Sequence, residues 1–436
     1  MRKPTKLVTL GLFVLAQLLF SCAGTQPENW THFRGSNLNG LSDSENVPIQ
    51  WSETKNIAWK VPVNGVGWSS PVVFNQQVWM TTADRDGDWF SVVCFDFDSG
   101  ELLQELELYR PDTVQRMHAT NSYATPTPCI EKDFVYVHYG TYGTACIDTR
   151  NFEVVWSRTD LNCEHLQGAA SSIILYKDLL IVHLEGTDVQ NIYALNKHTG
   201  ETVWQVGTPD QKAYNDVAPV YRKSYQTPLI IQVNGQDQLI TNRSLFAISY
   251  DPNTGKENWR VFYGEDSAVS MPLYYNGLVL VNSGWVLSQG APYFARLLAV
   301  DPTGKGDITE SHVVWQTDEH VPQTSTPVIV DSLMFMVDER GTLTCLNPGN
   351  GKVHWTEKLK GHFNCAPIYA AGVIYFTNTN GETSVIKAAP EFELLAKNKL
   401  EGTFKATPAV LRGAILQRSD KYLYKLAIME ENQAEI

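Results

Sequence analysis

The chain has 436 residues, of which 43% are hydrophobic and 19% are charged, so it is long enough to bury a core without disulfide bonds or structural metals. Its formal net charge of −13 at pH 7 would repel phosphate backbones, which argues against nucleic-acid binding. No compositionally biased stretch is long enough to predict disorder, so we expect a chain that is folded over most of its length.

The first residues have the pattern of an export signal. Arg2, Lys3 and Lys6 precede an apolar run over residues 7–20, which is too short to span a bilayer comfortably, and no second such run follows. We expect residues 1–21 to be a cleaved signal peptide. Loss of its three basic residues changes the net charge to −16.

The end of this run indicates a lipoprotein. The letters LFSC at 19–22 resemble the bacterial lipobox, in which the cysteine is linked to diacylglycerol and becomes the mature N-terminus. We expect Cys22 to be lipidated and residues 22–29 to form a short tether. Because no aspartate follows Cys22, the resemblance implies the outer membrane. Phe20 is bulkier than the lipobox usually allows, so an ordinary secretory signal with a chance cysteine is the alternative.

After a lead-in segment over residues 30–54, one pattern returns along the chain. The stretch NIYALNKHTGETVW at 191–204 recurs as TLTCLNPGNGKVHW at 342–355, as LFAISYDPNTGKENW at 245–259 and, without its tryptophan, as VVCFDFDSGELLQ at 92–104. Weaker copies occur at 144–156, 297–315 and 383–396. A short apolar strand precedes each copy, and one stands alone near the C-terminus. These strands open at a recurring slot, which is occupied by Pro71, Pro128, Ile173, Pro228, Pro272, Pro327, Pro367 and Pro408.

The slots lie 40 to 57 residues apart and define eight units of about 48 residues. In the sixth unit, STPVIV, LMFMVD, LTCLNP and KVHWTEK are rich in β-branched and aromatic residues and are separated by turn formers. Four antiparallel strands per unit without helical periodicity predict an all-β, eight-bladed β-propeller over residues 55–428, followed by a tail over 429–436. A linear β-solenoid is the alternative, although its coils are shorter.

The last unit ends without an outer strand, and a matching strand lies near the N-terminus. The letters KNIAWKVPV at 55–63 resemble GKVHWTEKL of the sixth unit and precede the first proline slot. We expect this segment, with Trp59, to pair with the C-terminal blade, because such pairing closes the ring and removes the open sheet edges.

The Thr-Gly pair of the repeat predicts a hairpin turn before the outer strand, in which glycine supplies a positive φ. The tryptophan that follows projects from the outer strand at a constant register. A large aromatic side chain there buries about 150–250 Å² against the neighbouring blade. We interpret these residues as structural clamps between blades rather than as ligand cages: Trp59, Trp156, Trp204, Trp259, Trp315 and Trp355.

The repeat resembles the pyrroloquinoline-quinone (PQQ) type of propeller repeat. This family includes quinoprotein alcohol dehydrogenases and the BamB-like lipoprotein subunit of the outer-membrane β-barrel assembly machinery. The resemblance covers residue 51 to the C-terminus. The letters WTHFRGSNLNGLS at 30–42 also resemble the start of a bacterial group of quinoprotein-like propellers. The repeat by itself does not imply the cofactor.

The resemblance to quinoprotein dehydrogenases implies adjacent cysteines over the quinone, a calcium ion held by acidic and amide side chains, and a catalytic aspartate. No two cysteines of this chain are adjacent. A disulfide that involves Cys129, Cys163 or Cys365 stays open. Three other cysteines occupy a slot that alanine fills elsewhere in the repeat, and we interpret them as small buried core residues: Cys94, Cys146 and Cys345.

We expect no cofactor, with PQQ and calcium as the alternative. The sequence also lacks a Gly-x-Ser-x-Gly elbow, a His-Glu-x-x-His motif and a phosphate-binding loop. The absence of these motifs favours a protein that is not an enzyme, and the one enzymatic alternative is a quinoprotein-type oxidoreductase.

In a propeller, the loops that enter the innermost strands and the loops that join the second and third strands share one face around the channel mouth. Ten residues ahead of the slots are candidates for this position: Trp68, His118, Tyr123, His165, Arg222, Tyr225, His320, His362, Asn364 and Lys405. The four histidines come from four units and could converge on a metal ion or a polar ligand. Polar residues that are simply solvated by water are the alternative.

Two loops predicted on the same face hold further candidates. Asp84, Asp86 and Asp88 could supply oxygen ligands for calcium, but an Asp-Gly hairpin explains them more simply. Three aromatic residues in a long loop are candidate contacts for a peptide, a partner protein or a sugar ring, unless that loop packs on itself: Trp285, Tyr293 and Phe294.

Together these patterns predict a non-catalytic, membrane-tethered platform that binds outer-membrane or periplasmic proteins and contacts the membrane through its lipid anchor only. One alternative is a quinoprotein-like enzyme or ligand-binding protein associated with polysaccharide degradation. Another is a glycan-binding module that takes a polysaccharide or oligosaccharide. The fold does not decide between them.

Overall fold

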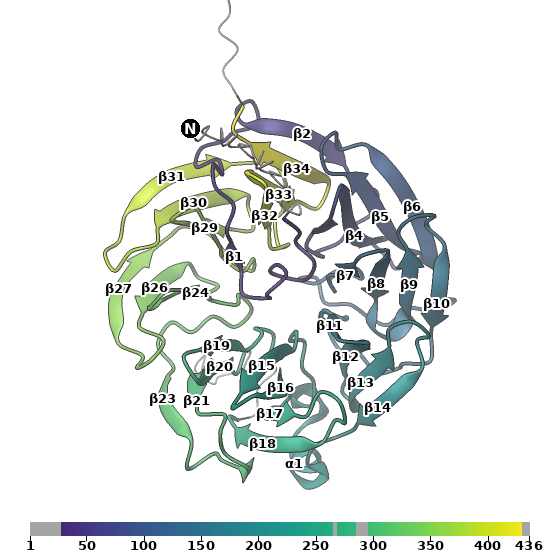
Figure 1. The fold of residues 1–436 in the computed structure, drawn as a ribbon, viewed down its shortest axis with the longest axis vertical. Helices are drawn as coiled ribbons and strands as arrows, with labels where there is room; N and C mark the ends of the chain where they lie inside the picture. Colours follow the sequence, from purple (N-terminus) through teal and green to yellow (C-terminus); the bar gives the residue numbers. More distant parts are fainter. Residues whose placement is uncertain (1–27, 265–267, 285–294, 430–436) are drawn as a thin grey trace, which may run out of the picture.

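The computed structural model describes residues 28–264, 268–284 and 295–429. Its main strands form eight sheets that stand around a central axis as the blades of a propeller (Figure 1). Each blade has four antiparallel strands, and two blades carry one additional short parallel strand. This confirms the predicted eight-bladed β-propeller. In all eight blades the recurring slot lies directly before the innermost strand.

The first four blades follow the chain from the axis outwards. Blade 1 consists of β3 (Val72–Phe74), β4 (Gln77–Ala83), β5 (Phe90–Asp96) and β6 (Leu102–Tyr109). Blade 2 consists of β7 (Cys129–Glu131), β8 (Phe134–His138), β9 (Thr144–Asp148) and β10 (Val154–Arg158). Blade 3 consists of β11 (Ile174–Tyr176), β12 (Leu179–Glu185), β13 (Gln190–Asn196) and β14 (Thr202–Val206). Blade 4 consists of β15 (Leu229–Val233), β16 (Gln236–Asn242), β17 (Phe246–Tyr250) and β18 (Glu257–Phe262).

The remaining blades keep the same order, except that blade 8 takes its outer strand from the N-terminal part of the chain. Blade 5 consists of β19 (Leu273–Tyr275), β20 (Leu278–Asn282), β21 (Leu297–Val300) and β23 (Val313–Thr317). Blade 6 consists of β24 (Val328–Val330), β25 (Leu333–Val337), β26 (Thr342–Leu346) and β27 (Val353–Lys358). Blade 7 consists of β28 (Ile368–Ala370), β29 (Val373–Thr377), β30 (Glu382–Lys387) and β31 (Leu394–Lys399). Blade 8 consists of β32 (Ala409–Leu411), β33 (Ala414–Arg418), β34 (Tyr422–Ala427) and β2 (Ile57–Pro62).

The ring is closed by pairing between the two ends of the chain. Strand β2 lies antiparallel to β34, with Trp59 opposite Lys425 and Val61 opposite Leu423. Figure 1 shows this contact between the purple and the yellow ends of the colour range. The predicted closure is therefore confirmed, and it leaves no blade with an unfinished set of strands.

The hydrophobic core is divided into layers between neighbouring blades, and the outer-strand tryptophans lie in or against these layers. Five indole N–H groups donate a hydrogen bond to a backbone carbonyl after the third strand of the next blade: Trp59 to Phe97 (3.1 Å), Trp156 to Lys197 (2.8 Å), Trp204 to Pro252 (3.1 Å), Trp315 to Pro348 (3.2 Å) and Trp355 to Ala389 (3.3 Å). Trp259 differs, because its N–H donates to Gln238 of its own blade (3.0 Å), while its ring is buried in the layer shared with blade 5.

The turn glycines face these tryptophans across the boundary between two neighbouring blades, which we call the seam. A Cβ atom added to Gly200 would lie 2.7 Å from the ring of Trp156, and one added to Gly255 would lie 2.8 Å from the ring of Trp204. Both glycines also have a positive φ. The repeat glycine is therefore required by the neighbouring blade as well as by its own turn.

Two short strands extend blades by parallel pairing. Strand β22 (Gly306–Asp307) belongs to the insertion in the fifth repeat copy and pairs with β18 of blade 4, beside Trp259 and Arg260. Strand β1 (Leu41–Ser42) belongs to the lead-in segment and pairs with β28 of blade 7. Each short strand therefore comes from a part of the chain that is distant in sequence from the blade it extends.

The lead-in segment crosses the centre of the ring and contacts the inner strands of several blades (Figure 1). Trp30 pairs with Val73 of blade 1, and the Thr31 carbonyl accepts a hydrogen bond from the N–H of Ile130 in blade 2 (2.9 Å). Arg34 is buried and donates to the carbonyls of Thr326 (2.5 Å) and Pro327 (2.7 Å) at the start of blade 6. We call the face on this side, where the innermost strands turn outwards, the closed face. The opposite face, where they begin, is the open face.

One α-helix in the described part of the chain was not predicted, and it lies in the connection between blades 3 and 4. Helix α1 (Gln211–Asp216) begins after Asp210, whose carboxylate accepts from the N–H of Ala213 (2.9 Å). Its buried Tyr214 donates to the carbonyl of Ser244 (2.5 Å). Six residues are too few for a helical periodicity that sequence patterns can reveal. Short 3₁₀ turns occur at η1 (Gly140–Tyr142) and η2 (Pro219–Tyr221).

Six cysteines lie in the described residues, and all are buried free thiols. This agrees with the core positions inferred for Cys94, Cys146 and Cys345, and it pairs none of Cys129, Cys163 and Cys365. Among the residues described, no helix has the length and apolar character needed to cross a membrane.

Candidate functional site

A cavity of about 430 Å³ lies where the channel opens between the innermost strands. Phe33 of the lead-in segment forms part of its wall, so the segment that crosses the ring also limits the cavity towards the closed face. The volume falls within the range of about 300–1,000 Å³ that is usual for small-molecule sites. It is the clearest candidate site in the described part of the chain.

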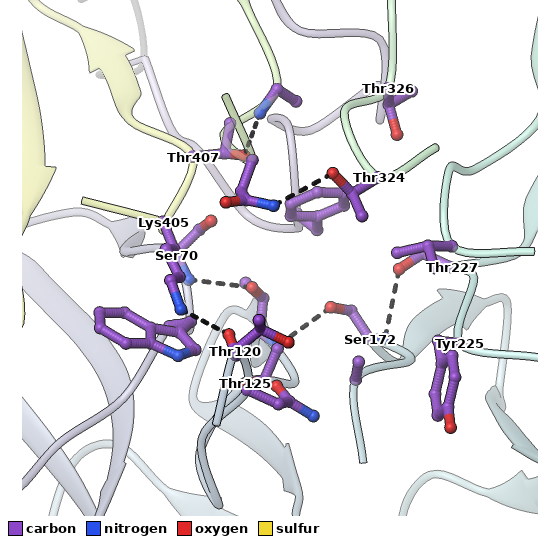
Figure 2. Close-up of a pocket in the computed structure, with 18 of the residues that line it drawn as sticks. Ser70, Thr120, Thr125, Ser172, Tyr225, Thr227, Thr324, Thr326, Lys405 and Thr407 are labelled. Carbon is purple, nitrogen blue, oxygen red and sulfur yellow. Dashed lines mark hydrogen bonds between the residues drawn. The ribbon is translucent and has the colours of Figure 1, made fainter. Parts of the chain in front are cut away.

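Hydroxyl side chains surround this cavity at one level, and we call them the hydroxyl ring: Ser70, Thr127, Ser172, Thr227, Thr326 and Thr407. Each residue immediately precedes a slot residue, so the repeat places its side chain at the same height in each blade. Figure 2 shows the ring around the cavity, with the labelled Ser172 and Thr227 from neighbouring blades.

Hydrogen bonds connect the hydroxyl ring from blade to blade. The N–H of Ser70 donates to the hydroxyl of Thr127 (3.0 Å), the N–H of Thr127 to that of Ser172 (3.0 Å), and the N–H of Ser172 to that of Thr227 (3.2 Å). The same contact joins Met271 to Thr326 (3.1 Å) and Ala366 to Thr407 (3.1 Å). The ring therefore stabilises the blade contacts and also presents oxygen atoms to the cavity.

The hydroxyl of Ser70 is the member of this ring that has no partner. Its side chain is 1% exposed, and its Oγ makes no hydrogen bond. Nearby, the indole Nε1 of Trp68 is also buried without a partner. A buried polar atom without a hydrogen bond costs about 1–3 kcal/mol, so both atoms mark a place where a partner would be favourable.

The rim of the cavity carries one described cation. Lys405 Nζ donates to the carbonyl of Thr120 (2.6 Å) and lies 4.8 Å from the ring centre of Trp68. Burial lowers the pKa of Lys405 from its ordinary value. In the connection before the neighbouring blade, Asn364 donates to the hydroxyl of Thr324 (3.3 Å). Figure 2 draws this hydrogen bond and the one from Lys405 to Thr120 as dashed lines.

Six of the ten predicted channel-mouth residues line this cavity: Trp68, His118, Tyr225, His362, Asn364 and Lys405. They come from several blades, as the prediction required, but the two histidines among them belong to a lining made mainly of hydroxyl, amide and aromatic side chains. The structure therefore brings part of the predicted set together, but in a lining of hydroxyl, amide and aromatic groups rather than in a cluster of four histidines.

The other four predicted residues lie away from the cavity. Tyr123 packs against Phe90 with 5.8 Å between ring centres, and Arg222 donates to the carbonyl of Val217 (2.8 Å). His320 is half exposed with its Nδ1 3.8 Å from an oxygen of Asp338. The fourth residue, His165, is buried. Their distances from the slot differ, so the chain places these side chains at different depths and angles.

His165 belongs to a small internal cavity of about 10 Å³, which it lines together with His138 and His183. Burial lowers the pKa of His165 to about 4 and that of His138 to about 3, so both rings are neutral at pH 7. The cavity has room for about one water molecule, so it cannot hold an organic ligand.

A buried ion pair lies beside this small cavity, between blades 3 and 4. Glu185 accepts from Nε of Arg243 (2.5 Å) and from the N–H of Ser244 (3.1 Å). Burial opposes the charged form of Glu185, but Arg243 and His183 hold its pKa below its usual value. Arg243 also donates to the carbonyl of Gln190 (2.8 Å). Since the charges are satisfied internally, this pair is a structural link between blades.

The proposed calcium ligands form a turn. The Asp84 carboxylate accepts from the N–H of Asp86 (2.7 Å), while Asp86 and Asp88 are exposed and Gly87 has a φ of +86°. No group of three His, Cys, Asp or Glu side chains in the described residues could hold a metal ion. The loop candidates Trp285, Tyr293 and Phe294 lie outside the described residues.

The described cavity lining does not fit PQQ with calcium as quinoprotein dehydrogenases bind them. No Asp or Glu side chain is among the described lining residues, so neither a calcium carboxylate ligand nor a catalytic aspartate is supplied there. No cysteine lines it either, so no disulfide could cover a quinone.

Solved structures share this fold at low sequence identity. BamB from Moraxella catarrhalis is 11% identical with a TM-score of 0.56, and the match covers 85% of this chain and 99% of that one. A quinohemoprotein alcohol dehydrogenase from Comamonas testosteroni is 12% identical with a TM-score of 0.63, covering 94% and 82%. The computationally designed Ika8 protein is 10% identical with a TM-score of 0.54, covering 89% and 99%. These similarities concern the fold alone.

The sequence itself matches a family model in three overlapping stretches, residues 50–206, 188–307 and 294–390. The description of that family is "Outer membrane protein assembly factor BamB". No curated protein matches the chain. Because the family match extends over well more than half of its length, this chain belongs to the BamB family of PQQ-type propellers.

Proposed function

We propose that this protein is a non-catalytic, lipid-anchored platform at the outer membrane and that it binds β-barrel assembly proteins through its open face. The family description supports an assembly role at the outer membrane. The cavity lining supports a non-catalytic role, since its described residues include no carboxylate or cysteine. The observation that carries the proposal is the position of the N-terminus.

Residue Glu28 is fixed on the closed face by blade 8. Its carboxylate accepts from the N–H of Arg412 (2.9 Å) and from the hydroxyl of Ser42 (3.1 Å), and its carbonyl accepts from Nε of Arg412 (2.8 Å). Six residues lead from the predicted lipidation site Cys22 to Glu28, and six residues span at most about 20 Å. A lipid on Cys22 would therefore keep the closed face near the membrane and direct the open face away from it.

Site-specific photo-cross-linking in the producing bacterium tests this orientation. A cross-linking amino acid at Lys360, in the connection between blades 6 and 7 on the open face, should form adducts with β-barrel assembly proteins. The matched control is Asn350, which is equally exposed in a turn of the same blade on the closed face. Adducts from Asn350 alone, or none from either position, would contradict the proposal.

The anchor is tested separately with Cys22→Ser. We expect this variant to lose fatty-acid labelling and to move from the membrane fraction to the soluble fraction, with fewer adducts from Lys360. Continued labelling and membrane association in Cys22→Ser would rule out the anchor on which the orientation depends.

A further inference from the structure

We propose that the cavity of the open face binds a neutral polyhydroxylated ring, the chemical class of a mono- or disaccharide. This inference concerns a small ligand inside the channel and does not depend on the platform role. It starts from the shape of the cavity, which has about 430 Å³ of space and is limited on one side by Phe33 of the lead-in segment. A ligand of this class would enter from the open face.

The charges of the lining argue against ions as ligands. Lys405 is the one Lys or Arg side chain among the described lining residues, and its Nζ is already bonded to the carbonyl of Thr120 (2.6 Å). A multiply charged anion would therefore find no unpaired ammonium or guanidinium group in that described lining. A cation would find no carboxylate there to offset its charge.

The remaining lining combines aromatic faces with hydroxyl and amide groups. Trp68, Tyr225 and Phe33 present rings, whereas the hydroxyl ring and the amides of Asn121 and Asn364 present donors and acceptors. A sugar ring has the matching pattern, because its C–H faces pack on aromatic rings and its hydroxyl groups both donate and accept hydrogen bonds. A purely apolar ligand would leave these polar groups unpaired.

Two buried atoms need the partners that such a ligand supplies. The Nε1 of Trp68 is a donor only, and the Oγ of Ser70 can donate or accept. Neither has a hydrogen bond within the protein. Both atoms are buried, so a sugar hydroxyl would pair with them when their side chains shift towards the bound ligand, and this pairing would remove a cost that the unliganded protein carries.

Isothermal titration of the folded mature domain with glucose, galactose, mannose, xylose and cellobiose tests the proposal. We expect saturable binding of at least one of these sugars. Glucuronate and PQQ serve as anionic comparisons and should bind more weakly. Absence of saturable binding by every neutral sugar, or tighter binding of either anion, would overturn the proposal.

Substitutions that remove the unpartnered atoms test the location of the site. Ser70→Ala and Trp68→Phe should each weaken sugar binding about tenfold, which corresponds to the loss of one hydrogen bond. The melting temperature of unliganded Ser70→Ala should not fall, because this hydroxyl has no partner to lose.

The matched control is Thr344→Val. The hydroxyl of Thr344 is also buried without a partner, but it lies in β26 of blade 6 and does not line the cavity. Sugar affinity should stay at the wild-type value in this variant. Unchanged affinity in both Ser70→Ala and Trp68→Phe would show that sugars bind elsewhere and would overturn the assignment of the cavity.

Discussion

The seam between blades 2 and 3 and the seam between blades 1 and 2 use the same backbone turn in different ways. At the first seam, Trp156 packs on Gly200 and donates to the Lys197 carbonyl (2.8 Å). At the second, Gln104 occupies the tryptophan position, and the equivalent turn position is Phe152 with a φ of +62°. At this second seam both the tryptophan and the glycine that would face it are missing. The seam between blades 6 and 7 differs again, because Trp355 there faces Phe392 in the turn of blade 7, with 5.2 Å between ring centres. Tryptophan and glycine therefore form one contact at the seam between blades 2 and 3, and other seams fill the same place with other residues.

The largest effect is expected from removing the seam that closes the ring. Deleting residues 55–63 removes β2 and Trp59, and it leaves β34 with an unpaired edge. The loss of a whole strand should exceed the usual net stability of about 5–15 kcal/mol, so the chain should fail to fold. Thermal unfolding followed by circular dichroism checks this, and a wild-type transition in the deleted protein would refute the closure argument.

The next largest effect is a difference in stability cost between a seam that contains a tryptophan and one that does not. Trp156→Ala should cost about 3–5 kcal/mol, as expected for a large aromatic residue in a core layer. Gln104→Ala, at the same register in blade 1, should cost less than about 1 kcal/mol because Gln104 is half-buried and polar. Urea unfolding of both variants measures the difference, and similar costs would remove the distinction between the seams.

A smaller effect is expected from changing only the turn glycine that faces Trp156. Gly200→Ala and Gly235→Ala both place a Cβ at a positive φ (+74° and +78°), which costs about 1–2 kcal/mol. The Cβ at Gly235 meets nothing within 4 Å, whereas the one at Gly200 lies 2.7 Å from the ring of Trp156. Gly200→Ala should therefore cost about 1–3 kcal/mol more.

A double variant checks that the extra cost belongs to the seam. In a Trp156→Ala background, Gly200→Ala should cost no more than Gly235→Ala does in the wild type, since the ring that it would contact is gone. Chemical unfolding of the four proteins completes the cycle. An undiminished cost in the double variant would mean that the glycine serves its own turn only.

The smallest expected effect is a dependence of stability on pH. It comes from the buried histidines beside blades 2 and 3. The pKa of His165 is lowered to about 4 in the folded protein, while an unfolded histidine titrates near 6.5. Between these values the unfolded chain binds more protons, so stability should fall as the pH drops from 6.5 to 4. In His165→Gln the fall should be smaller by on the order of 1 kcal/mol at pH 5. Melting temperatures measured from pH 7.5 to 4.5 test this, and parallel curves would contradict it.

The fold was predictable because each blade repeats the same local signals. The slot prolines mark the innermost strands, and the turn glycines and tryptophans mark the outer ones, so eight weak patterns support one another. Ring closure followed from counting strands, because the last unit lacks one and residues 55–63 supply it. Strand β22 and helix α1 did not follow, since two and six residues carry no periodicity.

The site was predictable only in part. The position ahead of each slot indicated the channel mouth, and six of ten candidates line the cavity. The hydroxyl ring was missed, although its signal was present as Ser or Thr immediately before the slot in six of the eight units. The contribution of Phe33 could not be foreseen, because the path of the lead-in segment depends on contacts with blades that follow much later in the chain.

The pairing of β2 with β34 also sets the order in which this protein can mature. Residues 57–62 leave the ribosome early, yet their partners at 422–427 are made only at the end of synthesis. Until then both strands have open edges, and the lead-in segment lacks the contacts that blades 6 and 7 supply. The ring can therefore close only when the chain is complete through β34, so a prematurely terminated product retains exposed strand edges that proteases and chaperones can recognise.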